Sequence, residues 1–139
     1  KRTLPYYCME FDHVGDKLSH VSYMTPRVSL ERTLKEISQC DLICRNCHRK
    51  RSYERNPAIY GNSYRGYRDS IFKLKIRCHD CERKFPHYCL DFDHVRGVKT
   101  NSVSKLLRTK PLLALSETFK CDIVCANCHA VRTHERSHE

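Results

Sequence analysis

Two short stretches of the chain, Tyr7–Val14 and Tyr88–Val95, mix apolar and polar positions in the manner of extended strands. Each stretch runs into an Asp-His pair. A polar turn that contains glycine then follows, over residues 15–17 in the first case and 96–99 in the second. The pattern therefore predicts a strand and a turn at two matching places in the chain.

Helical spacing follows each of these turns. In residues 29–38 three apolar side chains recur on one face, and Ser29 stands where it can cap the first turn. The matching stretch, residues 112–119, is more apolar and is predicted to be a helix that packs into the core.

The chain is also predicted to turn into a helix after each late Cys-x-x-Cys motif. With helical spacing, His129, Arg132 and Arg136 would then lie on one face. Each of these helices would present a possible ligand and two cations to the same partner. The corresponding residues in the first helix are His48, Arg51 and Arg55.

These matches belong to one duplication with a constant offset, and what recurs is mostly ligand and acid–base chemistry. We divide the chain into unit 1 (residues 1–57), a basic and aromatic connector (residues 58–76) and unit 2 (residues 77–139). The recurring pairs are Cys8/Cys89, Phe11/Phe92, Asp12/Asp93, His13/His94, Cys40/Cys121, Asp41/Asp122, Cys44/Cys125, Asn46/Asn127, Cys47/Cys128, His48/His129, Arg51/Arg132, Glu54/Glu135 and Arg55/Arg136.

The connector is predicted to be a loop followed by a short helix or strand, because Gly61 and Gly66 oppose one continuous helix. Its tyrosines are assigned to packing between the units, with stacking on nucleic-acid bases as the alternative.

Each unit is small enough to need a metal or a disulfide for stability. Ten cysteines could supply either. Their arrangement in Cys-x-x-Cys pairs and the lack of an apolar signal segment favour metal and a reducing intracellular compartment, cytoplasm or nucleoid, with an organelle left open. No run of residues is long and apolar enough to cross a membrane.

The formal net charge of +10 indicates that the partner of this protein is a polyanion. Basic residues cluster at 45–55, 65–77 and 132–136, two of these clusters lying at a cysteine motif. Clustered cations concentrate nucleic acid and make its binding sensitive to salt. A solvated basic surface is the alternative, but the repeated placement favours nucleic acid.

The cysteines of unit 2 form two Cys-x-x-Cys pairs, Cys78/Cys81 and Cys125/Cys128, which suit a tetrahedral zinc ion. Unit 1 has only one such pair, Cys44/Cys47. Either residues upstream of Lys1 are missing from this sequence, which we favour slightly, or Cys8 and Cys40 complete a zinc site with that pair.

Together, Asp-His and a later Cys-x-x-Cys-His resemble the HNH endonucleases of the ββα-metal class, especially small phage and bacterial members. In unit 2 the resemblance covers Cys78 to Arg136, through CHDC, FDHVRGVK, VS and KCDIVCANCHAVRTHER. In unit 1 it covers Phe11 to Arg55 and lacks the first cysteine pair. The expected fold is α+β, with two small zinc-stabilised ββα-metal units in tandem.

The resemblance implies a role for each matching residue. His94 would be the general base that takes a proton from water, and Asp93 and His129 would hold one catalytic divalent ion, expected to be Mg²⁺. The products would carry 5′-phosphate and 3′-hydroxyl ends. The same roles in unit 1 fall on His13, Asp12 and His48.

One position departs from the family pattern. Asp122 and Asp41 stand where the middle Asn is expected, whereas Asn127 and Asn46 lie inside the cysteine motif. Loss of activity in one unit therefore stays open, more so in unit 1.

The expected partner is double-stranded DNA, bound by a monomer that acts as an internal pseudo-dimer or by part of a larger assembly. A non-catalytic zinc-stabilised nucleic-acid-binding module, for instance in a ribonucleoprotein, is the main alternative, and a purely structural zinc protein is a third. The residues expected to contact nucleic acid are Arg51, Arg55, Arg132, Arg136, Lys99 and Lys17.

Overall fold

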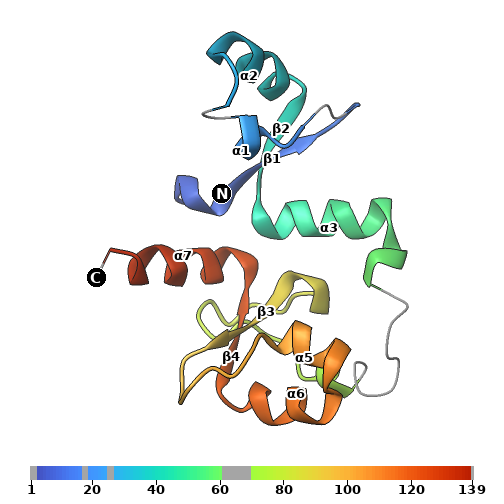
Figure 1. Ribbon diagram of the computed structural model, residues 1–139, viewed down its shortest axis with the longest axis vertical. Helices are drawn as coiled ribbons and strands as arrows, with labels where there is room; N and C mark the ends of the chain where they lie inside the picture. The colour runs from blue at the N-terminus through green and yellow to red at the C-terminus, as the bar shows by residue number, and fades with distance from the viewer. Residues whose placement is uncertain (1–2, 17–18, 25–26, 61–69, 139) are drawn as a thin grey trace.

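The computed structural model describes residues 3–16, 19–24, 27–60 and 70–138 (Figure 1). It combines short helices with two small antiparallel sheets, so the expected α+β class is confirmed. Lys17 lies outside the described residues, as do residues 61–69 with most of the connector's tyrosines. No helix in the described ranges is long and apolar enough to cross a lipid bilayer.

Unit 1 is built on a two-stranded sheet whose strands are far apart in the sequence. β1 (Met9–His13) pairs antiparallel with β2 (Cys40–Cys44), so that Asp12 lies opposite Asp41. The chain between the strands forms two short helices, and β2 leads directly into a longer one. In chain order the helical elements are η1 (Tyr6–Cys8), α1 (Val21–Met24), α2 (Leu30–Ile37), α3 (Arg45–Arg55) and η2 (Pro57–Tyr60).

Unit 2 repeats this order of elements. β3 (Leu90–His94) pairs antiparallel with β4 (Cys121–Cys125), and Asp93 lies opposite Asp122. An isolated bridge between Arg77 and Lys84 closes the loop that carries the first cysteine pair. The helical elements are η3 (His87–Cys89), α5 (Val103–Thr109), α6 (Pro111–Thr118) and α7 (Ala126–Arg136).

Local sequence explains where the helices begin. The hydroxyl of Ser29 accepts a hydrogen bond from the backbone N–H of Arg32, as predicted for the start of α2, and Ser102 caps α5 in the same way. Helices α3 and α7 begin one residue after the first cysteine of each late motif, earlier than predicted, because Cys44 and Cys125 are themselves the N-cap residues.

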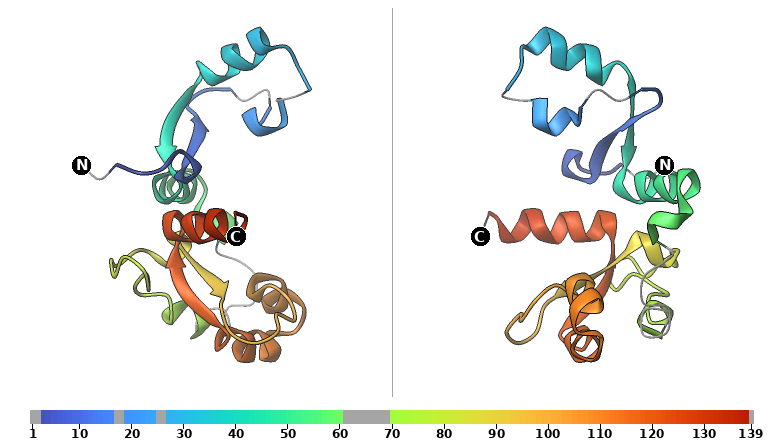
Figure 2. Two further views of the ribbon diagram at one scale, coloured as in Figure 1. Left: turned by 90° about the vertical axis from the view of Figure 1, so that its left-hand side faces the viewer. Right: turned by 45° about the vertical axis from the view of Figure 1, so that its right-hand side comes forward.

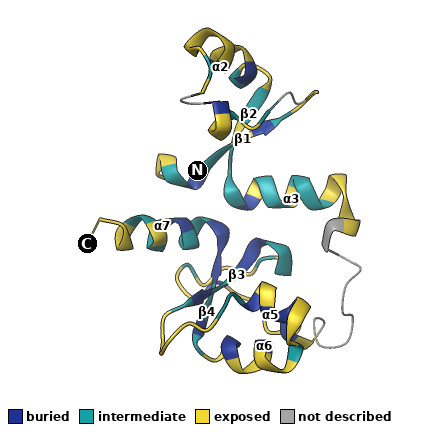
Figure 3. Cartoon of the chain, viewed as in Figure 1, coloured by how far each residue is buried: buried dark blue, intermediate teal, exposed yellow. Residues whose placement is uncertain are grey.

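The apolar clusters formed by described residues lie in unit 2 and at the end of the connector. Unit 2 also has more buried residues than unit 1 in the described ranges (Figure 3). One apolar cluster is built around α5 and α6, and Ile71 at the end of the connector is almost fully buried in it. Residues 70–73 are helical, as one of the two predictions for this segment had it. The end of the connector therefore packs with unit 2.

The prediction that residues 112–119 pack into the core is wrong for most of their apolar side chains. Leu112 and Phe119 are 69% and 76% exposed, whereas Ala114 and Glu117 are buried. Helix α2 has the same distribution of exposed and buried side chains. Leu30 is 72% exposed, and the buried residues Thr33 and Glu36 are polar. These helices turn a polar face inward because a buried glutamate on each one binds a histidine, as described below.

Units 1 and 2 meet through α3 and α7, whose N-terminal ends adjoin at the middle of the molecule (Figures 1 and 2). Each stacked aromatic contact between the units has a counterpart in which the two units swap roles. Tyr7 of unit 1 stacks on His134, with ring centroids 4.0 Å apart. Tyr88 of unit 2 stacks on Tyr53, with ring centroids 4.2 Å apart. The two units are thus related by an approximate two-fold exchange.

Polar contacts follow the same exchange. The thiol of Cys8 lies 3.5 Å from the carbonyl oxygen of Asn127, and the thiol of Cys89 lies 3.5 Å from that of Asn46. The backbone N–H of Asn46 also donates to the side-chain oxygen of Asn127 at 3.3 Å. The asparagines within the cysteine motifs therefore belong to the contact between the units.

Candidate functional site

Four cysteines of unit 2 gather at one point. The sulfur atoms of Cys78, Cys81, Cys125 and Cys128 all lie within 4.8 Å of one another, in a group that can hold one metal ion. Burial and the neighbouring thiolate of Cys125 raise the pKa of Cys128 far above its usual value. Thiolates packed this closely repel one another, and a divalent cation relieves that repulsion. The donor set therefore fits zinc.

Unit 1 shows no matching group among its described residues. The thiol of Cys40 donates to the carbonyl oxygen of Glu36 at 3.3 Å, and Cys8 faces unit 2. Neither joins Cys44 and Cys47. The structure therefore does not support the interpretation in which Cys8 and Cys40 complete a site in unit 1.

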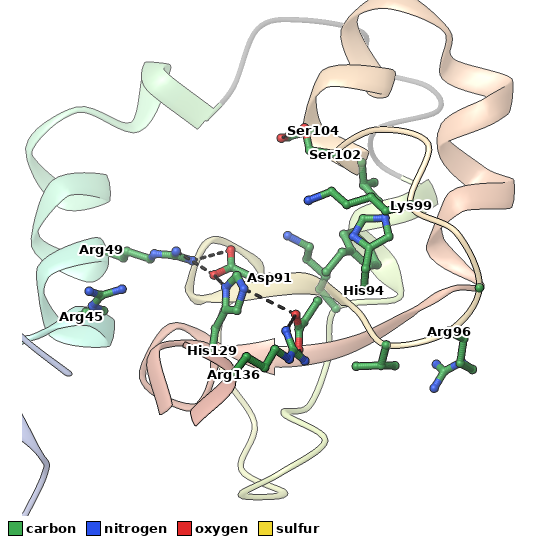
Figure 4. Close-up of a pocket in the computed structure, with 16 residues that line it drawn as sticks. Arg45, Arg49, Asp91, His94, Arg96, Lys99, Ser102, Ser104, His129 and Arg136 are labelled. Atoms are coloured by element: carbon green, nitrogen blue, oxygen red, sulfur yellow. Dashed lines mark hydrogen bonds and ion pairs between the residues drawn. The ribbon is translucent and has the colours of Figure 1, made fainter. Parts of the chain in front are cut away.

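Asp93 and His94 are the last two residues of β3, and Asp93 lies beside His129 of α7. His94 and His129 stand on different sides of one cleft (Figure 4). Nε2 of His129 is 3.7 Å from a carboxylate oxygen of Asp93, which is 4% exposed. Nδ1 of His129 is 3.0 Å from Asp91. Sheet and helix thus bring Asp93 and His129 together, as the family resemblance implies.

Two arginines of α7 hold the carboxylate of Asp93. Arg136 donates to both oxygens at 2.8 Å, and Arg132 donates to one of them at 2.9 Å. Burial raises the pKa of Asp93, but these hydrogen bonds outweigh burial and lower the pKa to about 2. Arg132 also binds Asp80 and Asp122, so it ties the first cysteine loop to both strands.

His94 has a buried partner that the sequence analysis missed. Nε2 of His94 is 3.0 Å from the carboxylate of Glu117 on α6. Glu117 also accepts hydrogen bonds from the backbone N–H of Thr100 at 2.9 Å and from Lys120 at 2.8 Å. These contacts, led by Lys120, lower the pKa of Glu117 to about 2. The signal was present in the sequence, because a glutamate recurs at this position in unit 1.

The same constellation stands in unit 1. Nε2 of His13 is 2.8 Å from the carboxylate of Glu36 on α2. Nε2 of His48 is 3.5 Å from Asp12, and its Nδ1 is 2.7 Å from Glu10. All five groups therefore occupy the places of their unit 2 counterparts.

Asp12 is held by arginines in its turn. Arg55 donates to both carboxylate oxygens, at 2.6 and 2.9 Å, and Arg51 donates at 3.1 Å. Burial raises the pKa of Asp12, and these donors lower it below its usual value. Arg51 also binds Asp41 at 2.7 Å. Asp41 and Asp122, at the position of the missing Asn, thus take part in arginine networks.

A cleft of about 990 Å³ opens beside His94 and His129 (Figure 4). Its walls come from both units, since α3 contributes two arginines and the turn after β3 contributes Lys99. Cations outnumber the carboxylates Asp91 and Asp93 around it. The cations that line the cleft are Arg45, Arg49, Lys75, Arg96, Lys99 and Arg136.

No protein-family model matches this chain, and no curated protein or solved structure matches it significantly.

Proposed function

We propose that this chain is a metal-dependent HNH-type endonuclease with two tandem ββα-metal units that hydrolyses phosphodiester bonds in DNA. The observation that carries the proposal is that His94, Asp93 and His129 line one cleft. The contacts of His94 with Glu117 and of His129 with Asp93 recur in unit 1 as His13 with Glu36 and His48 with Asp12. A purely structural zinc protein would need only the cysteines. The buried histidine–glutamate pairs have no part in holding zinc.

In this proposal His94 is the general base. With its Nε2–H donated to Glu117, the ring keeps a lone pair on Nδ1 that can accept a proton from water. The buried glutamate fixes that tautomer and holds the ring in place. His13 and Glu36 have the same geometry in unit 1.

Asp93 and His129 would hold the catalytic divalent ion, expected to be Mg²⁺. When bound, it supplies a positive charge that stabilises the scissile phosphate and the departing oxygen. The Asp93 carboxylate is ionised, as a ligand must be, because Arg132 and Arg136 keep its pKa low. The side chain of Arg136 is 46% exposed, so it can exchange this carboxylate for a phosphate of the substrate.

The cleft favours a nucleic acid as substrate. Six cations line it against two carboxylates. Such a surface attracts a phosphate backbone and gives binding that weakens steeply with salt. Two units that each cut one strand would let a single chain break both strands of a duplex.

The test is cleavage of supercoiled plasmid with Mg²⁺ and with EDTA. We expect the wild-type chain to produce linear DNA with Mg²⁺ only. His94→Ala or His13→Ala alone should leave a nicking enzyme, and the double variant should be inert while it still binds DNA in a shift assay. If His94→Ala abolishes all cleavage and His13→Ala has no effect, the two-site proposal fails and unit 1 only holds DNA.

A second candidate is a zinc-stabilised nucleic-acid-binding module without cleavage. One observation favours it, namely that Asp12 and Asp93 are each saturated by two arginines. In that case DNA binding would be independent of Mg²⁺, and the plasmid would stay supercoiled with the wild-type chain and with every histidine variant.

A further inference from the structure

The cleft of unit 2 is completed by an arginine from unit 1. Arg49 of α3 donates to both carboxylate oxygens of Asp91, each at 2.8 Å (Figure 4). It also lies 3.5 Å from the carbonyl oxygen of Tyr88. A guanidinium that meets a carboxylate through two parallel bonds fixes the orientation of the carboxylate as well as its charge.

Asp91 is the residue that orients His129. One of the two oxygens that accept from Arg49, Oδ2 of Asp91, also lies 3.0 Å from Nδ1 of His129. An ionised carboxylate there selects the tautomer with the proton on Nδ1, which leaves the lone pair on Nε2. Nε2 is the nitrogen that lies 3.7 Å from Asp93. Arg49, Asp91 and His129 therefore form one chain of contacts that begins in unit 1 and ends at the site of unit 2.

Among the described residues, no arginine of unit 2 binds the corresponding carboxylate of unit 1. Its counterpart of Asp91 is Glu10, which lies 2.7 Å from Nδ1 of His48 and 3.5 Å from Nε of Arg45 in its own unit. At the positions in unit 2 that correspond to Arg45 and Arg49, α7 carries Ala126 and Ala130. At these two positions α7 therefore offers no cation to Glu10.

We propose that Arg49 is a positioning residue for the other unit: through Asp91 it orients His129, so that unit 2 assembles its site on unit 1, while unit 1 assembles its own site alone. The catalytic consequence of this one-way dependence rests on the proposed endonuclease function. The orientation of His129 does not rest on it.

The first measurement needs no cleavage. Long-range ¹⁵N–¹H correlations of the histidine rings report which nitrogen of His129 carries the proton. We expect the Nδ1–H form in the wild-type chain and a mixture of both forms in Arg49→Ala. The control is Lys50→Ala, on the next residue of the same helix, whose ion pair with Glu54 is exposed and 3.9 Å long. An unchanged His129 spectrum in Arg49→Ala would overturn the proposal.

The second measurement separates the units. In a His13→Ala background only unit 2 is left to nick DNA, and there Arg49→Ala should slow nicking by roughly 10-fold or more, as loss of a residue that orients a metal ligand does. In a His94→Ala background, where unit 1 is left, the same change should slow nicking far less, because it removes only one cation of the cleft and no residue that orients His48. Equal losses in both backgrounds would mean that Arg49 serves only the fold or general DNA binding.

Two further results distinguish a failure of the positioning role of Arg49 from a failure of the proposed endonuclease function. Arg49→Lys retains the charge but not the two-pronged contact, so it should restore part of the rate, and it carries the test if Arg49→Ala fails to fold. If neither background nicks DNA at all, the proposed function fails, and the tautomer of His129 alone decides whether Arg49 positions it.

Discussion

Loss of one cysteine should cost unit 2 far more stability than the equivalent loss costs unit 1. Cys128 and Cys47 occupy the same place in the repeat, but only Cys128 belongs to a group of four sulfur atoms within 4.8 Å. Cys128→Ser and Cys47→Ser are therefore a matched pair. They make the same chemical change at the same position of equivalent helices.

The structure sets the size of the effect. The apolar cluster beside the four cysteines has Leu90 and Val124 as its fully buried aliphatic side chains. At about 1.5–3 kcal/mol each, they contribute roughly 5 kcal/mol. Structural zinc in small domains contributes about 10–16 kcal/mol, so one of four ligands is worth about 3 kcal/mol or more. The metal is thus expected to outweigh the local apolar core.

The assay is urea denaturation followed by circular dichroism, with the zinc content of each variant measured after dialysis. Cys128→Ser should lose zinc or about 3 kcal/mol of unfolding free energy, and Cys47→Ser should change it by less than about 0.5 kcal/mol. A wild-type chain that keeps its fold and its denaturation midpoint after dialysis has removed all zinc would refute the reasoning.

Further predictions concern the charged groups at the cleft. Glu117→Gln should lower the nicking rate of unit 2 without weakening DNA binding, because His94 loses its charged partner; equal losses in rate and affinity would contradict a positioning role. Arg136→Ala should reduce the slope of log affinity against log salt by about 1, since one phosphate contact is lost. Arg132→Ala should leave that slope unchanged and lower the unfolding free energy by about 2 kcal/mol, because this arginine is 16% exposed and joins three carboxylates; a changed slope would show that it contacts the nucleic acid.

The cysteine spacing and the family resemblance together predict much of the candidate site. The four cysteines of unit 2 come together as their paired spacing predicts, and Asp93 meets His129 because one ends a strand and the other follows the N-terminus of a helix. These predictions succeed since ligand chemistry leaves few alternative arrangements. The strand partners β2 and β4 were not predicted, because Cys44 and Cys125, the last residues of these strands, were interpreted only as zinc ligands.

Burial on the short helices could not be read from their hydrophobic spacing. Leu112 and Phe119 are exposed, while Glu36 and Glu117 are buried. Periodicity assigns apolar faces to the interior, and it cannot anticipate a carboxylate that is buried because a histidine and several donors satisfy it. The carboxylate partners of the arginines on α3 and α7 were not predicted either, since Asp12 and Asp93 lie on strands that are distant in the sequence.

The exchanged stacking of Tyr7 on His134 and of Tyr88 on Tyr53 has a consequence for how this protein can evolve. A surface that pairs with its own copy across a two-fold axis is typical of homodimers, in which every mutation appears on both sides at once. Joining the copies in one gene removes that constraint. An arginine can then arise at position 49 while an alanine stands at the equivalent position 130. The two halves can therefore acquire different side chains and different roles, which identical chains in a dimer cannot.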